Sequence, residues 1–497
     1  MKSSDPLLEA WRKTLARKGD TPAIFDTNGA ALRSFRQIEE EARTYETRLG
    51  AFDRGRVVAI QIGNHEDWPS ILLACLRRGL VALPLEQSIS EQERDLSMQV
   101  CGGSGLIASP AVALTPALSR GERWSLLPSG PSGEDEDEGF DPKKPARALL
   151  YRLDNRMPPN WVANQPSLLK LTSGTTALPR AIRFRSEQLL ADCENICRTM
   201  GISDADLNFG VIPISHSYGF SNLLTPLLAR GVSMVLSRDR LPRAVLNDLA
   251  QTKATVFPGM PVFYQAFCEL DERPHLPNLR LCISAAAPLT AATAKNFREE
   301  FNLPIHSFYG SSECGGICYD REGAASEDGF VGAPIDNVNI SLIDAPAESS
   351  QIRVRSAAVG NGYFPEPDEQ RLGRGIFIPD DLLARHSSGF TIVGRISDVI
   401  NVAGKKVSPA EVEAQLLQFG GVREAVVFGR KSALRNEEVA ACVVADANVR
   451  ESELLTFCRK RLSAWQVPKQ IFLLDQIPVN ARGKTSRREL AARFAAR

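Results

Sequence analysis

The chain has 497 residues, with 59 lysines and arginines, 59 aspartates and glutamates, and 43% hydrophobic residues. This length fits about two to four domains with large cores, and the balanced charge removes the usual electrostatic reason to expect nucleic-acid binding. No apolar run is long enough for a membrane span and the first segment resembles an amphipathic helix, so we expect a cytoplasmic protein.

The N-terminal part alternates strand-like and helix-like segments. Residues 57–62 (VVAIQI) and 80–85 (LVALPL) are short apolar runs typical of buried strands, and 68–77 between them predicts a helix. From 109 to 164 the composition shifts to proline, glycine and serine, with an acidic run (EDEDE) at 134–138. This predicts a solvated, partly disordered insertion, and an acidic binding segment is the alternative.

Regular alternation resumes after Leu168. Strands are predicted at 209–212, 233–236, 254–257, 279–283 and 305–308, and helices at 221–229, 243–251, 261–269 and 291–301. Strands that alternate with helices of this length predict a largely parallel, helix-covered sheet, and ligands of such sheets bind beyond the carboxyl ends of the strands.

Beyond 394 the pattern changes to a small α+β unit. Helices are predicted at 409–418 and 451–463, and strands at 424–428, 439–444 and 470–474. We therefore expect an α/β fold with a large N-terminal multi-subdomain domain over 1–393, containing parallel-type sheets, and a small mobile C-terminal α+β domain over 394–497. The ten cysteines are scattered without CxxC pairs, which favours reduced thiols over disulfides or a zinc site.

The strongest local signal is the run LTSGTTALPR at 171–180. Small hydroxyl residues around a glycine, directly after an apolar strand, can offer backbone N–H groups and hydroxyls to a polyphosphate. The run differs from the GxxxxGK[ST] loop of P-loop nucleotidases, and a run of this composition also occurs in ordinary turns.

This run resembles the phosphate-binding loop of the adenylate-forming, or AMP-binding, superfamily, which includes acyl-CoA synthetases, peptide-synthetase adenylation domains and luciferases. Other stretches are similar to further motifs of the superfamily, in its order: IPISHSYG (212–219), SAAAP (284–288), YGSSE (309–313), GFVGAP (329–334), DDL (380–382), GR (394–395), GKKVSPAEVE (404–413) and GK (483–484). Because these motifs span about 170 to 485 in order, the chain is identified as a member of the AMP-dependent synthetase and ligase type.

The resemblance implies a two-step reaction. The carboxylate of an acid attacks the α-phosphate of ATP, pyrophosphate leaves, and the acyl-adenylate then passes its acyl group to the thiol of CoA. Two anions must meet in the first step, so cationic and hydrogen-bonding groups are required. The residues implied to contact the nucleotide are Thr172, Ser173, Gly174, Thr175, Thr176, Arg180, Ala285, Tyr309, Gly310, Ser311, Ser312, Asp381, Arg395, Gly404 and Lys405.

Within that set the resemblance assigns separate parts of ATP. The hydroxyl residues of 172–176 face the β- and γ-phosphates, and Tyr309 flanks the adenine. Asp381 accepts hydrogen bonds from the ribose, and Arg395 reaches the ribose or a phosphate; a structural ion pair is the alternative for these two.

Three further residues are implied to act in catalysis. Glu313 would hold Mg²⁺, for which an exposed surface carboxylate is the alternative. Lys484 would reach the α-phosphate and the attacking carboxylate, and a solvated lysine is the alternative. His216 would orient the acid carboxylate and gate the pocket, or else is a packed or solvent-facing histidine.

The second step implies a hinge. In the superfamily the small domain turns about one residue, here Ser397, and presents Gly404 to the active site. Lys405 and Lys406 would then lie near the pantetheine path or the phosphates of CoA, with a solvated basic loop as the alternative.

The acid and the acceptor stay open. Residues 212–219 contain no carboxylate to pair with a substrate ammonium, which favours a plain carboxylic acid, fatty or aryl, over an α-amino acid. ATP, Mg²⁺ and CoA are the expected cofactors and co-substrates. An acyl-carrier protein as acceptor, or closure of a β-hydroxy acid to a β-lactone, are the alternatives.

Two positions of the loop depart from the superfamily. Ala177 replaces a glycine and Arg180 replaces a lysine, and these changes bear on ATP affinity and turnover rather than on the fold. A catalytically degenerate nucleotide-binding homologue is therefore a further alternative.

Overall fold

The protein forms two compact units. The computed structural model describes residues 5–110, 124–127, 148–153, 159–161, 165–172, 179–325, 327–343, 349–402, 405–432, 436–479 and 485–495. The large unit comprises Met1–Ser341, Arg353–Ile378 and His386–Thr391, and the small unit comprises Leu342–Ile352, Pro379–Arg385 and Ile392–Arg497. The expected combination of a large α/β part and a small α+β part is confirmed.

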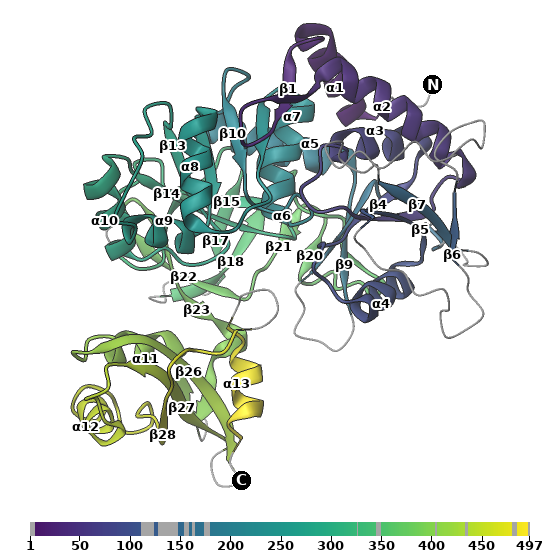
Figure 1. Cartoon of the computed structure of the whole chain (residues 1–497). Coiled ribbons are helices and arrows are strands. Elements are labelled where there is room, and N and C mark those ends of the chain that lie inside the picture. Colours follow the sequence, from purple (N-terminus) through teal and green to yellow (C-terminus); the bar gives the residue numbers. More distant parts are fainter. Residues whose placement is uncertain are drawn as a thin grey trace. The chain divides into compact units, whose positions relative to one another are not determined.

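The first sheet of the large unit has the strand order β19-β9-β8-β4-β3-β5-β7-β6. β3 (Val57–Gln61) pairs in parallel with β4 (Val81–Pro84) and β5 (Gly103–Ala108), and α3 (Trp68–Arg78) connects β3 to β4. Figure 1 labels α3, β4 and β5 in this part of the large unit. All side chains of β3 are buried, as a continuous apolar run in a covered parallel sheet requires. The remaining strands are β6 (Trp124–Leu126), β7 (Leu149–Leu153), β8 (Leu168–Leu171), β9 (Ala181–Phe184) and β19 (Tyr363–Phe364).

The second sheet carries, within the large unit, the order β2-β1-β11-β10-β12-β13-β14-β15-β16. Its strands are β1 (Pro22–Phe25), β2 (Ala31–Ser34), β10 (Leu207–Gly210), β11 (Ser233–Leu236), β12 (Val256–Gly259), β13 (Leu281–Ser284), β14 (Ile305–Ser311), β15 (Gly315–Tyr319) and β16 (Phe330–Pro334). The pairs from β1 to β14 are parallel and those from β14 to β16 antiparallel. Parallel strands end at one edge, so the residues that follow β13 and β14 can meet there.

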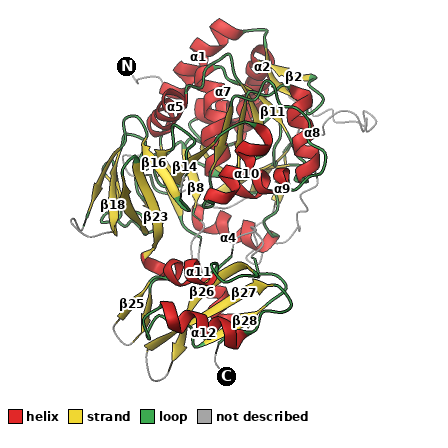
Figure 2. Ribbon diagram, turned by 90° about the vertical axis from the view of Figure 1, so that its left-hand side faces the viewer, coloured by secondary structure: helices red, strands yellow, loops and turns green. Residues whose placement is uncertain are grey.

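Helices cover this sheet, and an aromatic cluster fills the interface. Figure 2 shows α8 (Pro242–Thr252), α9 (Pro261–Cys268) and α10 (Ala291–Phe301) packed as neighbours. The ring centroids of Tyr264 and Phe297 are 5.1 Å apart, and those of Phe257 and Tyr264 are 5.4 Å apart. The helices predicted at 243–251, 261–269 and 291–301 are confirmed.

The helix predicted at 221–229 begins earlier. The helical path runs through α6 (Ser217–Gly219), the π-turn segment η2 (Phe220–Leu224) and α7 (Thr225–Arg230). A Cβ on Gly219 would lie 2.1 Å from the carbonyl oxygen of Pro213, so only glycine allows this close turn. A glycine in the first turn is a weak helix signal, and tertiary contact decides the start.

The segment predicted as one solvated insertion, 109–164, contributes two strands. β7 pairs antiparallel with β5, and β6 pairs with β7. Leu150 and Leu153 of β7 are buried, because this strand extends the edge of the first sheet. The prediction was wrong for these residues, since a strand of 5 residues carries little compositional weight in a polar stretch. The acidic run at 134–138 lies outside the described residues.

Glu39 joins the three N-terminal helices. Its carboxylate accepts hydrogen bonds from Trp11 Nε1 of α1 (Pro6–Lys18) at 2.9 Å and from Arg43 Nε of its own helix, α2 (Phe35–Arg48), at 3.0 Å. The guanidinium of Arg77 on α3 also donates to it. Burial raises the pKa of Glu39, but the hydrogen bonds from Arg77, Trp11 and Arg43 outweigh burial, so the pKa is lowered overall.

We predict that Glu39→Gln lowers the free energy of unfolding at neutral pH by about 1–3 kcal/mol, because charged hydrogen bonds are lost. A carboxyl group with a lowered native pKa stabilises the fold above its unfolded pKa, and this contribution disappears as the pH falls through the native value. The unfolding free energies of both proteins in urea should therefore begin to converge as the pH falls below the ordinary carboxyl pKa of 4.5 and should meet below the lowered native pKa. Glu40→Gln, at an exposed position of the same helix, is the matched control, and an equal loss there would contradict the prediction.

The small unit contains a sheet with the order β25-β24-β27-β26, to which β28 adds in parallel beside β27. Its elements are β24 (Ile400–Val402), β25 (Lys405–Val407), α11 (Pro409–Leu416), β26 (Val422–Ser432), β27 (Asn436–Ala445), α12 (Glu451–Arg461), β28 (Gln470–Leu473) and α13 (Arg487–Arg493). Side chains alternate across the strands. Val439 and Val443 pack with α11 and α12, whereas Cys442 and Val444 pack with Leu490 of α13.

All ten cysteines are free thiols, and nine of them are buried. Among the described residues, no helix combines the length and apolarity that crossing a bilayer requires.

Candidate active site

The two ends of the Ser/Thr/Gly loop, Thr172 and Arg180, are joined by hydrogen bonds. The backbone N–H of Thr172, directly after β8, donates to the carbonyl oxygen of Arg180 at 2.8 Å, and the Thr172 hydroxyl donates to the same oxygen at 3.2 Å. Ser173, Gly174, Thr175, Thr176 and Ala177 lie outside the described residues, so their predicted contacts with phosphate stay predictions.

Arg180 lies over an aromatic ring. Its guanidinium carbon is 3.7 Å from the ring centroid of Tyr363, and Nη2 donates to the carbonyl oxygen of Glu366 at 3.1 Å. The Nε donor is buried and has no hydrogen-bond partner in the described part of the chain. A cation with a buried donor still to satisfy, at the end of this loop, is suited to an anionic ligand.

Glu313 follows β14 and is half-buried. Its Oε2 accepts a hydrogen bond from the hydroxyl of Ser311, and its Oε1 accepts one from the hydroxyl of Tyr363 at 3.2 Å. The backbone N–H of Glu313 donates to the Ser311 oxygen at 3.0 Å. The pKa of Tyr363 is raised, first by burial and then by the charge of Glu313.

A third segment meets the turn that carries Glu313. Ser217 Oγ donates to Ser312 Oγ at 2.9 Å, which brings the start of α6 against the predicted nucleotide motif. The preceding residue, His216, caps this helix, and its Nδ1 accepts the backbone N–H of Tyr218 at 3.2 Å. The neutral imidazole therefore carries its proton on Nε2, where it is a hydrogen-bond donor.

The predicted adenine contacts lie at the ends of β13 and β14. Ala285 directly follows β13 and is 6% exposed, and Tyr309 within β14 is 8% exposed. Gly310, by contrast, is exposed. The parallel pairing of these strands gives the three residues one sheet edge.

The predicted ribose residues pair with each other in the small unit. Arg395 Nε, at the end of β23 (Gly389–Arg395), donates to Asp381 Oδ1 at 2.6 Å. Asp381 begins β22 (Asp381–His386), and its side chain is 10% exposed against 61% for Arg395. The contact has the form of the ion pair stated as the alternative, and a role of either residue in ribose binding stays a prediction.

Of the remaining predicted residues, the structure describes Ser397 and Lys405. Ser397 falls within the short 3₁₀ segment η3 (Ile396–Asp398). Lys405 is exposed, and its Nζ lies 3.7 Å from the ring centroid of Trp465. Gly404 and Lys484 lie outside the described residues. Arg487, which follows Lys484 by three positions, donates to Asp398 Oδ2 at 2.7 Å.

The sequence analysis missed two features of the site. Tyr363 contacts both Arg180 and Glu313, although its position in an irregular Gly-rich stretch carries no strong signal. Lys170, on the strand before the loop, and Asp192, which accepts the backbone N–H of Gly316 after the Glu313 turn, are both buried. A lysine inside the apolar strand LLKL was the available signal for this pair.

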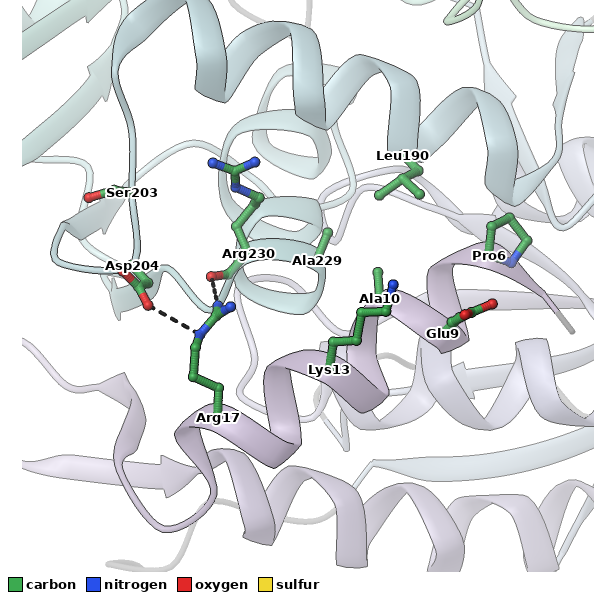
Figure 3. A pocket seen from close by; sticks show the side chains of 10 residues that line it. All are labelled: Pro6, Glu9, Ala10, Lys13, Arg17, Leu190, Ser203, Asp204, Ala229 and Arg230. Carbon is green, nitrogen blue, oxygen red and sulfur yellow. Dashed lines mark hydrogen bonds and ion pairs between the residues drawn. The ribbon is translucent and has the colours of Figure 1, made fainter.

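A cavity of about 570 Å³ lies elsewhere in the large unit, between α1, α5 (Ser186–Met200) and α7 (Figure 3). Its central cation, Arg17, is already paired with Asp204 at 3.3 Å and with the carbonyl oxygen of Arg230 at 2.6 Å. It contains none of the residues predicted to bind ATP, so it does not compete with the candidate active site.

Comparison with known proteins shows which chains and folds are similar to this one. The chain is 28% identical over 504 residues to a feruloyl-CoA synthase of Amycolatopsis sp, covering 98% of this chain and 99% of that protein. It is 24% identical over 530 residues to a long-chain-fatty-acid–CoA ligase of Escherichia coli O157:H7, covering 97% and 94%. The crystal structure of ATP-bound MatB from Rhodopseudomonas palustris has the same fold, with a TM-score of 0.80 at 23% identity over 98% of both chains.

Two family models match the sequence. The model of the AMP-binding enzyme family matches residues 11–364, and that of the AMP-binding enzyme C-terminal domain matches residues 411–484. Since the first model alone spans well over half of the sequence, the chain belongs to the AMP-binding enzyme family.

Proposed function

We propose that this protein activates a carboxylic acid with ATP, releasing pyrophosphate and forming an acyl-adenylate, and then transfers the acyl group to the thiol of CoA with release of AMP. The observation that supports this most directly is the contact of Tyr363 with both Arg180 and Glu313. A cation and a carboxylate beside a Ser/Thr/Gly loop are the groups needed to bind a metal-complexed polyphosphate.

Glu313 is the residue proposed to hold Mg²⁺. Both of its oxygens accept hydrogen bonds from neutral hydroxyls, and within the described ranges it forms no ion pair with lysine or arginine. Each carboxylate oxygen keeps a further lone pair, and Mg²⁺ in nucleotide sites typically takes one or two carboxylates together with phosphate oxygens. The donor set therefore fits the metal, which when bound would neutralise charge on the phosphates.

We propose that one residue of the large unit positions the acid and that residues of the small domain act in the two steps. His216 Nε2–H would donate to the substrate carboxylate and hold it for attack on the α-phosphate. The lid domain is proposed to begin at about Gly394 and to turn at Ser397. Lys484 would serve the first step, and Gly404 with Lys405 would face CoA in the second.

The acid is proposed to be fatty or aryl. The segment 212–219, which carries His216, contains no carboxylate that could pair with an ammonium group of a substrate. The relatives reported above are named for ferulate and for long-chain fatty acids, so the family includes both classes.

The test is acid-dependent pyrophosphate release with Mg-ATP over short, medium, long and aromatic acids, each with and without CoA. Release with one acid class, accelerated by CoA and giving a thioester, is the expected result. Adenylate formation that responds only to an acyl-carrier protein, or that yields AMP and a β-lactone, would replace the CoA step. ATP binding without release for any acid would contradict the proposed function and favour a degenerate homologue.

A further inference from the structure

Tyr363 is brought to the candidate active site by strand pairing. β19 pairs antiparallel with β9, with Tyr363 opposite Ile182 and Phe364 opposite Ala181. Since β9 directly follows Arg180, this register places the Tyr363 ring beside the end of the phosphate loop. The same chain segment also reaches the Glu313 turn, because the backbone N–H of Gly360 donates to the carbonyl oxygen of Glu313 at 2.8 Å.

The two ends of the Tyr363 side chain have different partners. Its hydroxyl donates to Glu313 Oε1 at 3.2 Å, and its ring faces the guanidinium of Arg180 at 3.7 Å. Tyr363 is buried, with the residue 3% exposed, so its side of both contacts is shielded from water, whereas Glu313 and Arg180 are partly exposed. A shielded hydroxyl fixes the rotamer of a carboxylate, and a shielded ring strengthens a cation–π contact.

We propose that Tyr363 is a positioning residue that holds Glu313 ready for magnesium and Arg180 ready for the phosphates of ATP. This inference rests on the proposed function, because it assigns Glu313 to the metal and Arg180 to the nucleotide. It differs from a purely structural role in one respect: among the described residues, the hydroxyl contacts the carboxylate of Glu313 and the ring contacts the cation of Arg180. The two contributions can therefore be removed separately.

Tyr363→Phe removes the hydroxyl and keeps the ring. Partners that orient a metal-binding carboxylate contribute about 10–100-fold to metal affinity, so the Mg²⁺ concentration that half-saturates the tightening of ATP binding should rise about 10-fold. ATP affinity measured in EDTA should not change. Calorimetric titration of ATP at a series of Mg²⁺ concentrations gives both quantities without turnover.

Arg180→Lys tests the other contact. Lysine keeps the charge but lacks the planar group that stacks on the ring, so ATP affinity in EDTA should fall by about 5-fold while the Mg²⁺ dependence stays at the wild-type value.

Tyr45→Phe is the matched control for Tyr363→Phe, because Tyr45 is also a buried tyrosine whose hydroxyl donates to a carboxylate, Asp67, at 2.6 Å. It should lower the melting temperature without altering either nucleotide measurement.

The outcomes separate this inference from the proposed function. If wild-type protein binds ATP more tightly with Mg²⁺ but Tyr363→Phe has the same Mg²⁺ dependence, the positioning role is overturned and the proposed function stands. If Tyr363→Phe weakens ATP binding equally in Mg²⁺ and in EDTA, Tyr363 is a structural residue only. If Mg²⁺ has no effect on ATP binding by the wild-type protein, the metal role of Glu313 fails and both proposals fail with it.

Discussion

Replacing Lys484 by alanine should lower acid-dependent pyrophosphate release by about 10²–10³-fold. Attack of a carboxylate on the α-phosphate concentrates negative charge between two anions, and an ammonium group placed there stabilises the transition state more than the ground state. Loss of one such charge-stabilising donor typically costs this factor in rate. The Michaelis constant for ATP should change little, because the phosphate loop and Glu313 remain.

A matched control for Lys484 is available in the same unit. Lys469 is exposed and precedes β28, so Lys469→Ala removes a similar charge and should leave pyrophosphate release unchanged. A chemically supplied acyl-adenylate should still react with CoA on the Lys484→Ala protein, since the role proposed for the lysine is confined to the first step. Equal loss of both half-reactions would instead indicate that the substitution disrupts the small unit.

The strands that build the two sheets could be predicted because their apolar runs are continuous. The run at 57–62 contains β3 (Val57–Gln61), which is buried along its whole length, and this pattern requires no knowledge of its partners. The antiparallel part from β14 to β16 could not be predicted, because its register depends on turns such as Gly315 rather than on composition. The strand at 149–153 could not be predicted either, because its 5 residues stand in a stretch whose overall composition is polar.

The residues of the candidate site also fall into those that could be predicted from the sequence and those that could not. Thr172 could be found because it lies in a run of small hydroxyl residues at a strand end, whereas Arg180 and Glu313 were identified through the resemblance of their motifs to those of the superfamily. Tyr363 could not, because only the pairing of β19 with β9 brings it to them. The residues that support the site are also brought together only by the tertiary fold. The buried residues Lys170 and Asp192 give the clearest test of this support.

Lys170 and Asp192 lie under three segments of the site. The ammonium of Lys170, on β8, lies 4.9 Å from the ring centroid of Phe184 and 5.2 Å from that of Phe220. Asp192 Oδ1 accepts the backbone N–H of Gly316 at 2.9 Å, and a Cβ on Gly315 would lie 2.0 Å from the same oxygen. The pair therefore supports the strand before the phosphate loop, the π-turn segment after His216 and the turn after Glu313.

Burial dominates the ionisation of both members. It lowers the pKa of Lys170 and raises the pKa of Asp192, and in each case the charge of the other member opposes the shift. Asp192→Ala would leave Lys170 buried without its counter-charge and Gly316 without its acceptor. The free energy of unfolding at neutral pH should then fall by about 1–3 kcal/mol, the usual cost of leaving a buried polar group without its partner.

The double variant Lys170→Met/Asp192→Asn should recover most of that loss, because methionine suits the aromatic surroundings and asparagine keeps an acceptor for Gly316.

The pH dependence of the free energy of unfolding gives an independent test of the same two residues. Asp192→Ala lowers the native pKa of Lys170 further, so the unfolded chain binds more protons than the native one from that value up to the ordinary lysine value of 10.5. The stability of this variant should therefore rise with pH over that window, which begins at a lower pH than in wild type, whereas the double variant should lack the rise. A double variant that is no more stable than Asp192→Ala would show that the two residues act independently, and the support would then lie in the hydrogen bond to Gly316 alone.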